Sequence, residues 1–354
     1  MANNIDIFDS YYLAGVVEEI APRKTFFRDR FFPTAPSDIF STNKVLVEYK
    51  DADRRMTPFV VEMAGDTPVD RSGYQVMEFA PPMVAPSRIL TIDDLRMRGF
   101  GEAVLSNITP AERARALQMK DLTDLDARIA RREEWMCAQV MINNAVDLVE
   151  YADNQDVGIP RRLQFYDQVT NHTFTPDNQW DVAGGDMLGD VMAMCDLLME
   201  RGLSATDLVI GGEVASFIRD NATLQGLLNN RRYELGSIKP QEMYPGVAWM
   251  GQLNFSGYLL DVWVVRETYV NDLGATTLYF PTDAAMVTAP GCGRLLYGAV
   301  TQIEPDKQFH TFAERRVPKF VVNEDKDIRK LRLAAKPLAA PANMSPFIYA
   351  ANVT

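Results

Sequence analysis

Apolar and polar residues alternate through much of the sequence from position 44 to position 92. KVLVEYK (44–50) and TPFVVEM (57–63) carry alternating apolar positions, which predict two strands, and the polar DADRRM (51–56) between them predicts the connection of a long hairpin. Two stretches rich in Gly and Pro follow, and then the strand-like RILTI (88–92). Extended segments without a helix rarely make a compact domain alone, so we expect a projecting loop here.

A long helix is predicted to begin at Thr109. Thr109 is a good N-cap, Pro110 occupies the first helical position, and Glu112 can return a hydrogen bond to the cap. Apolar residues then recur at helical intervals to about Val149, with no further Gly or Pro. The apolar steps are too irregular for a two-stranded coiled coil, because the charged residues 131–134 interrupt them. We therefore expect a single long helix lying across a sheet.

The second half of the chain mixes strands and short helices. RLQFYD (162–167) and HTFTP (172–176) are predicted to form a hairpin, and residues 186–202 form an amphipathic helix that ends at Gly202. DLVIG (207–211) predicts a strand, residues 213–219 and 224–228 predict two short helices, and strand patterns dominate from 247 to 300. In the C-terminal tail, KFVVN (319–323) and PFIYAAN (346–352) predict strands, the second of which could return to a sheet formed by earlier residues. The fold class that these elements indicate is α+β.

Four phenylalanines stand close together near the N-terminus, within KTFFRDRFFP (24–33). A free tail would not expose so many aromatic rings, so the segment must be covered. Two explanations remain open. The rings either pack on the core of their own chain, or they belong to an arm that reaches across a neighbouring subunit.

Composition narrows the functional classes. The chain has 354 residues, 47% of them hydrophobic, so it can bury a large core, and its net charge of −12 gives no general electrostatic grip on nucleic acid phosphates. There is no signal-like start and no long apolar run, which is typical of a protein made in the cytoplasm with no membrane partner. Three widely spaced cysteines, Cys137, Cys195 and Cys292, are expected to be buried and reduced.

The sequence carries no pattern that predicts a catalytic, cofactor-binding or metal-binding residue. His172 and His310 stand apart from any pattern of zinc ligands or nucleophile partners. Gly211-Gly212 follows a strand and precedes a helix, the setting of a phosphate-binding turn, but the rest of a nucleotide motif is missing. Neighbouring carboxylates at 93–94 and 133–134 are interpreted as solvated faces or helix charges.

Three local phrases resemble one protein family. TFFRDRFFP (25–33) is similar to the aromatic segment of its N-terminal arm, GRLLYG (293–298) to its RxxxYG stretch, and residues 331–353, with AKPL (335–338), to its closing strand. The family is the lambda-type major capsid protein, also called phage capsid protein E, whose subunits have a Hong Kong 97-like fold. The resemblance extends over nearly the whole chain.

The resemblance implies a division of the chain. Residues 1–38 would be an N-terminal arm, 39–95 an extended β-hairpin loop, 96–185 a peripheral domain with the long helix as its spine, 186–310 an axial domain, and 311–354 a return to the peripheral domain. Contacts between subunits are expected at the arm and the loop, and the residues selected for them are Phe26, Phe27, Phe31, Phe32, Arg54, Arg55, Met56 and Phe59.

The function implied is that of a major capsid protein, not an enzyme. Copies of the chain would form hexamers and pentamers of an icosahedral head shell, assembled in the host cytoplasm, around DNA that is held without sequence recognition. Decoration, scaffold and portal proteins are the other implied partners, and no cofactor is implied. An encapsulin-like compartment shell is one alternative. The other is an α/β enzyme that uses the Gly211-Gly212 turn.

Overall fold

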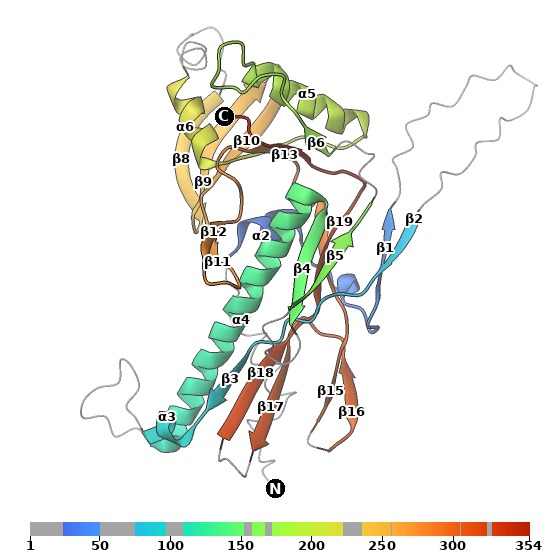
Figure 1. Cartoon of the computed structure of the whole chain (residues 1–354), viewed down its shortest axis with the longest axis vertical. Helices are drawn as coiled ribbons and strands as arrows, with labels where there is room; N and C mark the ends of the chain where they lie inside the picture. The colour runs from blue at the N-terminus through green and yellow to red at the C-terminus, as the bar shows by residue number, and fades with distance from the viewer. Residues whose placement is uncertain are drawn as a thin grey trace, which may run out of the picture.

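The computed structural model describes residues 24–49, 75–96, 109–151, 158–166, 172–221, 236–255, 257–304, 306–323 and 328–354 (Figure 1). A seven-stranded sheet lies at one end of the elongated molecule, and a long helix runs from it toward smaller sheets at the other end. This is the α+β class that the sequence predicts and that the resemblance implies. The predicted hairpin turn at 51–56, the strand at 57–63 and the short helix at 224–228 lie outside the described residues.

The seven-stranded sheet draws its strands from distant parts of the chain. Its order is β6 (Thr173–Phe174), β20 (Ile348–Ala350), β13 (Ala285–Thr288), β7 (Asp207–Ile210), β10 (Tyr258–Val265), β9 (Val247–Phe255) and β8 (Gly236–Tyr244). β10 runs parallel to β7, and β20 runs parallel to β6, while the other neighbours are antiparallel.

Alternating side chains on the central strands give this sheet two apolar faces. Leu208 and Ile210 of β7 point to one face, where α5 (Met187–Glu200) and α6 (Gly212–Asp220) cover them, while Val209 between them points to the other. The second face packs on α2 (Phe26–Phe31) and the C-terminal half of the long helix. One sheet therefore joins two hydrophobic cores.

The long helix, α4, spans Pro110–Asn143 and starts as predicted. The Glu112 amide donates to Thr109 Oγ1 at 3.3 Å, and the Thr109 amide donates back to Glu112 Oε2 at 2.8 Å. At about 1.5 Å per residue, the 34 residues extend roughly 51 Å. The first half of α4 packs on β18 (Ile328–Ala334), and the second half enters the core below the seven-stranded sheet.

Four antiparallel strand pairs, which we call ribbons, lie outside the seven-stranded sheet. They are β1–β2 (Val45–Tyr49 with Gln75–Phe79), β4–β5 (Ala145–Tyr151 with Gly158–Gln164), β11–β12 (Thr268–Val270 with Thr276–Leu278) and β15–β16 (Val300–Ile303 with Phe309–Phe312). Three further elements are η1 (Pro36–Asp38), α3 (Ile92–Arg96) and the pair β14–β19 (Gly293–Tyr297 with Pro337–Pro341). β17 (Val317–Asn323), β18 and β3 (Ser87–Leu90) form a three-stranded sheet along α4.

Two sequence predictions about these elements are wrong. α4 ends at Asn143 rather than near 149, because Asn144 takes a left-handed conformation (φ 51°) and the residues after it form β4. The predicted hairpin of 162–167 with 172–176 does not form, since β5 pairs with β4 and β6 joins the seven-stranded sheet.

Candidate functional site: the buried junction and the exposed ribbons

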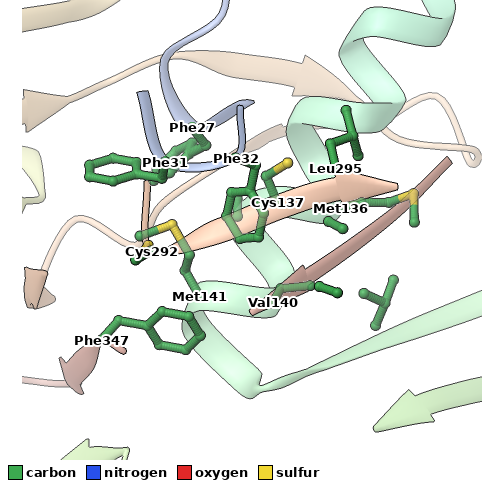
Figure 2. Packing of buried hydrophobic residues seen from close by; sticks show 14 of the residues in the cluster. Phe27, Phe31, Phe32, Met136, Cys137, Val140, Met141, Cys292, Leu295 and Phe347 are labelled. Atoms are coloured by element: carbon green, nitrogen blue, oxygen red, sulfur yellow. The ribbon is translucent and has the colours of Figure 1, made fainter. Parts of the chain in front are cut away.

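The N-terminal aromatic segment forms α2, and its rings lie inside their own chain. Phe26 and Phe31 are 0% exposed, and Phe27 and Phe32 are 1% exposed. Figure 2 shows the rings of Phe27, Phe31 and Phe32 among side chains of α4 and β14. Of the two explanations left open by the sequence, packing on the chain's own core is therefore the one observed.

Burial of these four rings corrects the contact role selected for them. A ring with no exposed surface offers nothing to a neighbouring subunit, so the contact residues Phe26, Phe27, Phe31 and Phe32 do not agree with this structure. The other four selected residues, Arg54, Arg55, Met56 and Phe59, lie outside the described residues.

The aromatic segment and the GRLLYG stretch pack directly against each other. A Cβ built on Gly293 would lie 2.2 Å from the Phe32 ring, so only glycine leaves room for that ring. Five residues along the chain from Gly293, Gly298 receives the Pro81 ring at 3.2 Å from its hypothetical Cβ. The two segments 25–33 and 293–298, which lie far apart in the sequence, thus contact each other in the folded chain.

Glu134 of α4 holds the first turn of α2. Its Oε1 accepts from the Phe27 amide at 2.7 Å, and its Oε2 accepts from the Arg28 amide at 2.8 Å. Amides at the start of a helix lack partners within the helix, so the carboxylate supplies what the chain itself does not. Complete burial raises the pKa of Glu134 to about 7 against these two hydrogen bonds.

Glu133, the preceding residue, sits at the centre of a buried charge network. Arg316 donates to its two carboxylate oxygens at 2.7 and 2.9 Å, Tyr297 donates to it at 2.9 Å, and Arg28 donates to it at 3.2 Å. Burial by itself raises the pKa of Glu133, but the charge and hydrogen bonds of Arg316 outweigh burial and hold that pKa below its ordinary value. The interpretation of Glu133 and Glu134 as part of a solvated face is wrong, since both are buried.

A second ion pair fastens α2 to the seven-stranded sheet. Arg30 donates to both carboxylate oxygens of Asp207 at 2.6 and 2.8 Å, and its guanidinium lies 4.4 Å from the centre of the Trp263 ring. Asp207 begins β7 and Trp263 lies on β10. α2 is therefore bound by charge to α4 on one side and to the sheet on the other, which fixes the angle between helix and sheet.

Backbone carbonyls of residues 282 and 284 occupy the amide groups at the Gly211-Gly212 turn. The Thr282 carbonyl accepts from the amides of Glu213 and Val214 at 3.0 and 3.4 Å, and the Gly211 amide donates to the Ala284 carbonyl at 3.0 Å. A Cβ on Gly211 would lie 2.2 Å from the Pro281 carbonyl oxygen. The amides that would bind a phosphate are thus already used, and this argues against the enzyme alternative.

The cysteines and histidines of the chain, all of them within the described ranges, also show no arrangement there that indicates catalysis or metal binding. The three cysteines are free and buried, as predicted. His172 Nε2 donates to the Ile142 carbonyl oxygen, 2.8 Å away, and burial lowers the pKa of this histidine. His310 lies 2.7 Å from Asp306. In the part of the chain that the structure describes, no group of three or more His, Cys, Asp or Glu is arranged to hold a metal ion.

The ribbons carry apolar side chains that their own chain leaves exposed. Phe309 of β16 is 75% exposed, Val270 of β11 is 67% exposed, and Ile159 of β5 is 62% exposed. On β1–β2 the same holds for Leu46 and Val76, at 55% and 48%. Apolar residues repeated on the exposed sides of strand pairs are typical of surfaces that another protein covers. Among the described residues, no helix has the length and apolar character needed to cross a membrane.

Comparison with known proteins agrees with this architecture. A model of the family described as phage major capsid protein E matches residues 9–352. No protein with a curated description matches the chain. Among solved structures, a putative capsid protein of a prophage from E. coli CFT073 aligns with a TM-score of 0.67 and 15% identity, covering 98% of this chain and 99% of the other. A phage-related protein from Bordetella bronchiseptica RB50 aligns with a TM-score of 0.53 and 9% identity, covering 96% of each chain.

Proposed function

The chain belongs to the phage major capsid protein E family and is a shell-forming subunit of a phage virion; on that premise, we propose that its copies close as hexamers and pentamers into the icosahedral head of a tailed phage. The head would enclose the DNA genome. Assembly would take place in the host cytoplasm before the DNA enters.

The exposed apolar ribbons are the observation that carries this proposal. The body of the subunit has two well-packed cores, yet Phe309, Val270 and Ile159 remain mostly in contact with solvent. Burying apolar surface yields about 25 cal/mol per Å². Repeated contacts between ribbons of neighbouring copies would supply this burial many times in one shell, so modest individual contacts add up to a stable container.

The subunit division proposed for the shell follows the family, with changes at three points. Residues 39–95 would form the extended loop, 96–185 the peripheral domain around α4, and 186–310 the axial domain. However, the strands at 87–90 and 348–350 pair across these limits, with β18 and β13 respectively. The arm assigned to 1–38 would be limited to its first part, because residues 26–32 pack in the core of their own chain.

The acidic balance of the chain supports a container role toward DNA. A net charge of −12 disfavours tight binding of phosphates, so packaged DNA would remain free to slide along the inner wall, held without sequence recognition. Portal, scaffold and decoration proteins would complete the head. Membership of a phage capsid family favours this function over an encapsulin-like compartment.

Electron microscopy of the purified protein tests the proposal. The full chain would be expressed alone and fractionated by sedimentation before imaging. Closed shells, with five- and sixfold clusters of subunits in averaged images, would support it. A uniform small oligomer at every protein and salt concentration would refute it, and shells that contain host enzymes rather than DNA in infected cells would favour the compartment alternative.

A further inference from the structure

A groove of about 620 Å³ lies between α4 and the β11–β12 ribbon. α4 contributes Arg128, Arg131, Arg132 and Trp135, whose spacing of three, four and seven residues places them on one face of the helix. Residues 269–272 of the ribbon and its turn form the opposite wall. Within a chain of net charge −12, this is a locally basic surface.

Two of the three guanidiniums lack a counter-charge. Arg132 is paired with Asp272 and lies 5.3 Å from the centre of the Trp135 ring. Arg128 and Arg131 are exposed, and nowhere in the described ranges does a carboxylate pair with either. An anionic group from outside would find two unpaired arginines on one helical face.

The rim of the groove indicates what kind of anion fits. Val270 is 67% exposed and Leu273, in the turn of the ribbon, is 89% exposed. Asp272 also lies in the groove, where it pairs with Arg132. A nucleic acid backbone would gain nothing from the apolar rim. An acidic peptide that carries an apolar side chain suits both the arginines and the rim.

A loop of matching character lies on the same chain, before α5. From residue 173 to residue 200 the sequence has six carboxylates and no lysine or arginine. Asp177 and Asp181 are exposed, the described residues offer neither of them a cation, and Val182 beside them is 52% exposed. The loop thus presents two unpaired carboxylates and one apolar side chain.

This loop is held in shape before any contact forms. Trp180 is buried, its amide donates to the Val353 carbonyl at 2.6 Å, and its indole donates to Asp190 at 2.7 Å. The Gly185 amide donates to the Val182 carbonyl at 3.0 Å. A rigid loop loses little conformational entropy when it docks.

We propose that the acidic loop 177–182 of one copy docks into the Arg128–Arg131 groove of the next copy. Within one copy the two surfaces cannot meet, because Figure 1 shows the start of α5 near the C-terminus, well away from β11–β12. Each copy offers both surfaces, so the contact is head to tail, and head-to-tail contacts generate a ring when the rotation between copies closes. The proposal rests on the proposed shell function and names one contact within its rings.

Charge exchange tests this contact. Three variants of the full chain would be compared with the wild type: R128E/R131E, D177K/D181K, and the combination of all four changes. R115E/K120E is the matched control, since it makes the same change of charge at exposed positions of the same helix outside the groove. The measured quantity is the protein concentration at which half of the subunits sediment as shells.

We expect each charge-reversed pair to raise this concentration at least tenfold, the control to leave it within about twofold, and the combined variant to return most of the way to the wild type. Normal assembly of R128E/R131E, or a combined variant no better than either parent, would overturn the proposal. Normal shells with less packaged DNA would also overturn it, in favour of a nucleic acid contact.

Folding is checked by the thermal midpoint of each unassembled variant. If a reversed variant fails to fold, R131Q and D181N replace it, and loss of the salt sensitivity of assembly then becomes the criterion, because a contact between charges weakens with salt. Failure of the wild type itself to form shells would refute the shell function. Failure of charge exchange with normal wild-type shells would refute only this contact.

Discussion

Replacing Arg316 by methionine would leave Glu133 in the protein interior without its main counter-charge. Glu133 is 0% exposed, and Arg316 donates two hydrogen bonds to it and a third to Asp126 at 2.7 Å. Methionine keeps much of the length of the arginine side chain, so packing changes less than charge. The perturbation therefore isolates the electrostatic link between α4 and the strands that follow β16.

The expected loss of stability is large. Removing one partner of a buried ion pair costs about 3–5 kcal/mol, because the remaining charge stays buried and uncompensated. Tyr297 and Arg28 still donate to Glu133 at 2.9 and 3.2 Å, so we expect the lower half of that range, about 3 kcal/mol. The double variant E133L/R316M removes both charges and should lose less than R316M alone.

Urea unfolding of unassembled subunits, followed by tryptophan fluorescence, measures this difference. R315M is the matched control, since Arg315 is exposed and its guanidinium lies 5.4 Å from the Tyr297 ring without a carboxylate of the network. The reasoning is refuted if R316M and R315M lose the same stability, or if E133L/R316M is less stable than R316M.

Three further predictions concern the same junction and the glycine turn. Burial raises the pKa of Glu134 from 4.5 to about 7, so the contribution of this group to stability is largest below pH 4.5. That contribution falls as pH rises from 4.5 through 7, by up to about 3 kcal/mol. Urea titrations at several pH values should show this fall in the free energy of unfolding, and E134Q should remove most of it. F31A should cost about 3–5 kcal/mol in the same assay, whereas F309A, at an exposed position, should cost under about 1 kcal/mol in the subunit yet weaken shell assembly. G211A should lower soluble yield and thermal midpoint, since its Cβ would lie 2.2 Å from a carbonyl oxygen, while G257A, with open space around its Cβ, should lose mainly the cost of its positive φ.

Local signals predicted local structure well. The start of α4 was readable because Thr109, Pro110 and Glu112 satisfy the helix end by themselves, and the structure shows the expected reciprocal hydrogen bonds. α5 and α6 were likewise predicted close to their observed bounds. The end of α4 was missed because Asn144 ends the helix by taking a left-handed backbone conformation. A single asparagine is a weak sequence signal beside the apolar periodicity that continues on both sides of it.

The buried contacts of Glu133 and Glu134 could not be predicted from the sequence, for a physical reason. Glu133 and Glu134 look like surface charges until their partners are known, and those partners, Arg28 and Arg316, stand 105 and 183 residues away from Glu133. Only the folded chain brings these charges together. A weak signal was present, however, because two charged residues interrupt the apolar face of a helix that otherwise packs against the core.

The role of the aromatic segment changes the account of assembly. The resemblance implied contacts between subunits at Phe26, Phe27, Phe31 and Phe32, but these rings complete the subunit's own core. The surface left for neighbours lies instead on the ribbons. Family membership and the fold, rather than the aromatic segment, support the shell function.

A cryo-electron microscopy map of the assembled shell, at a resolution that shows side chains, tests the central claim most directly. We predict that Phe309, Val270 and Ile159, which are exposed in the single subunit, lose most of their solvent contact against neighbouring copies. A shell in which these side chains remain in solvent would contradict the account.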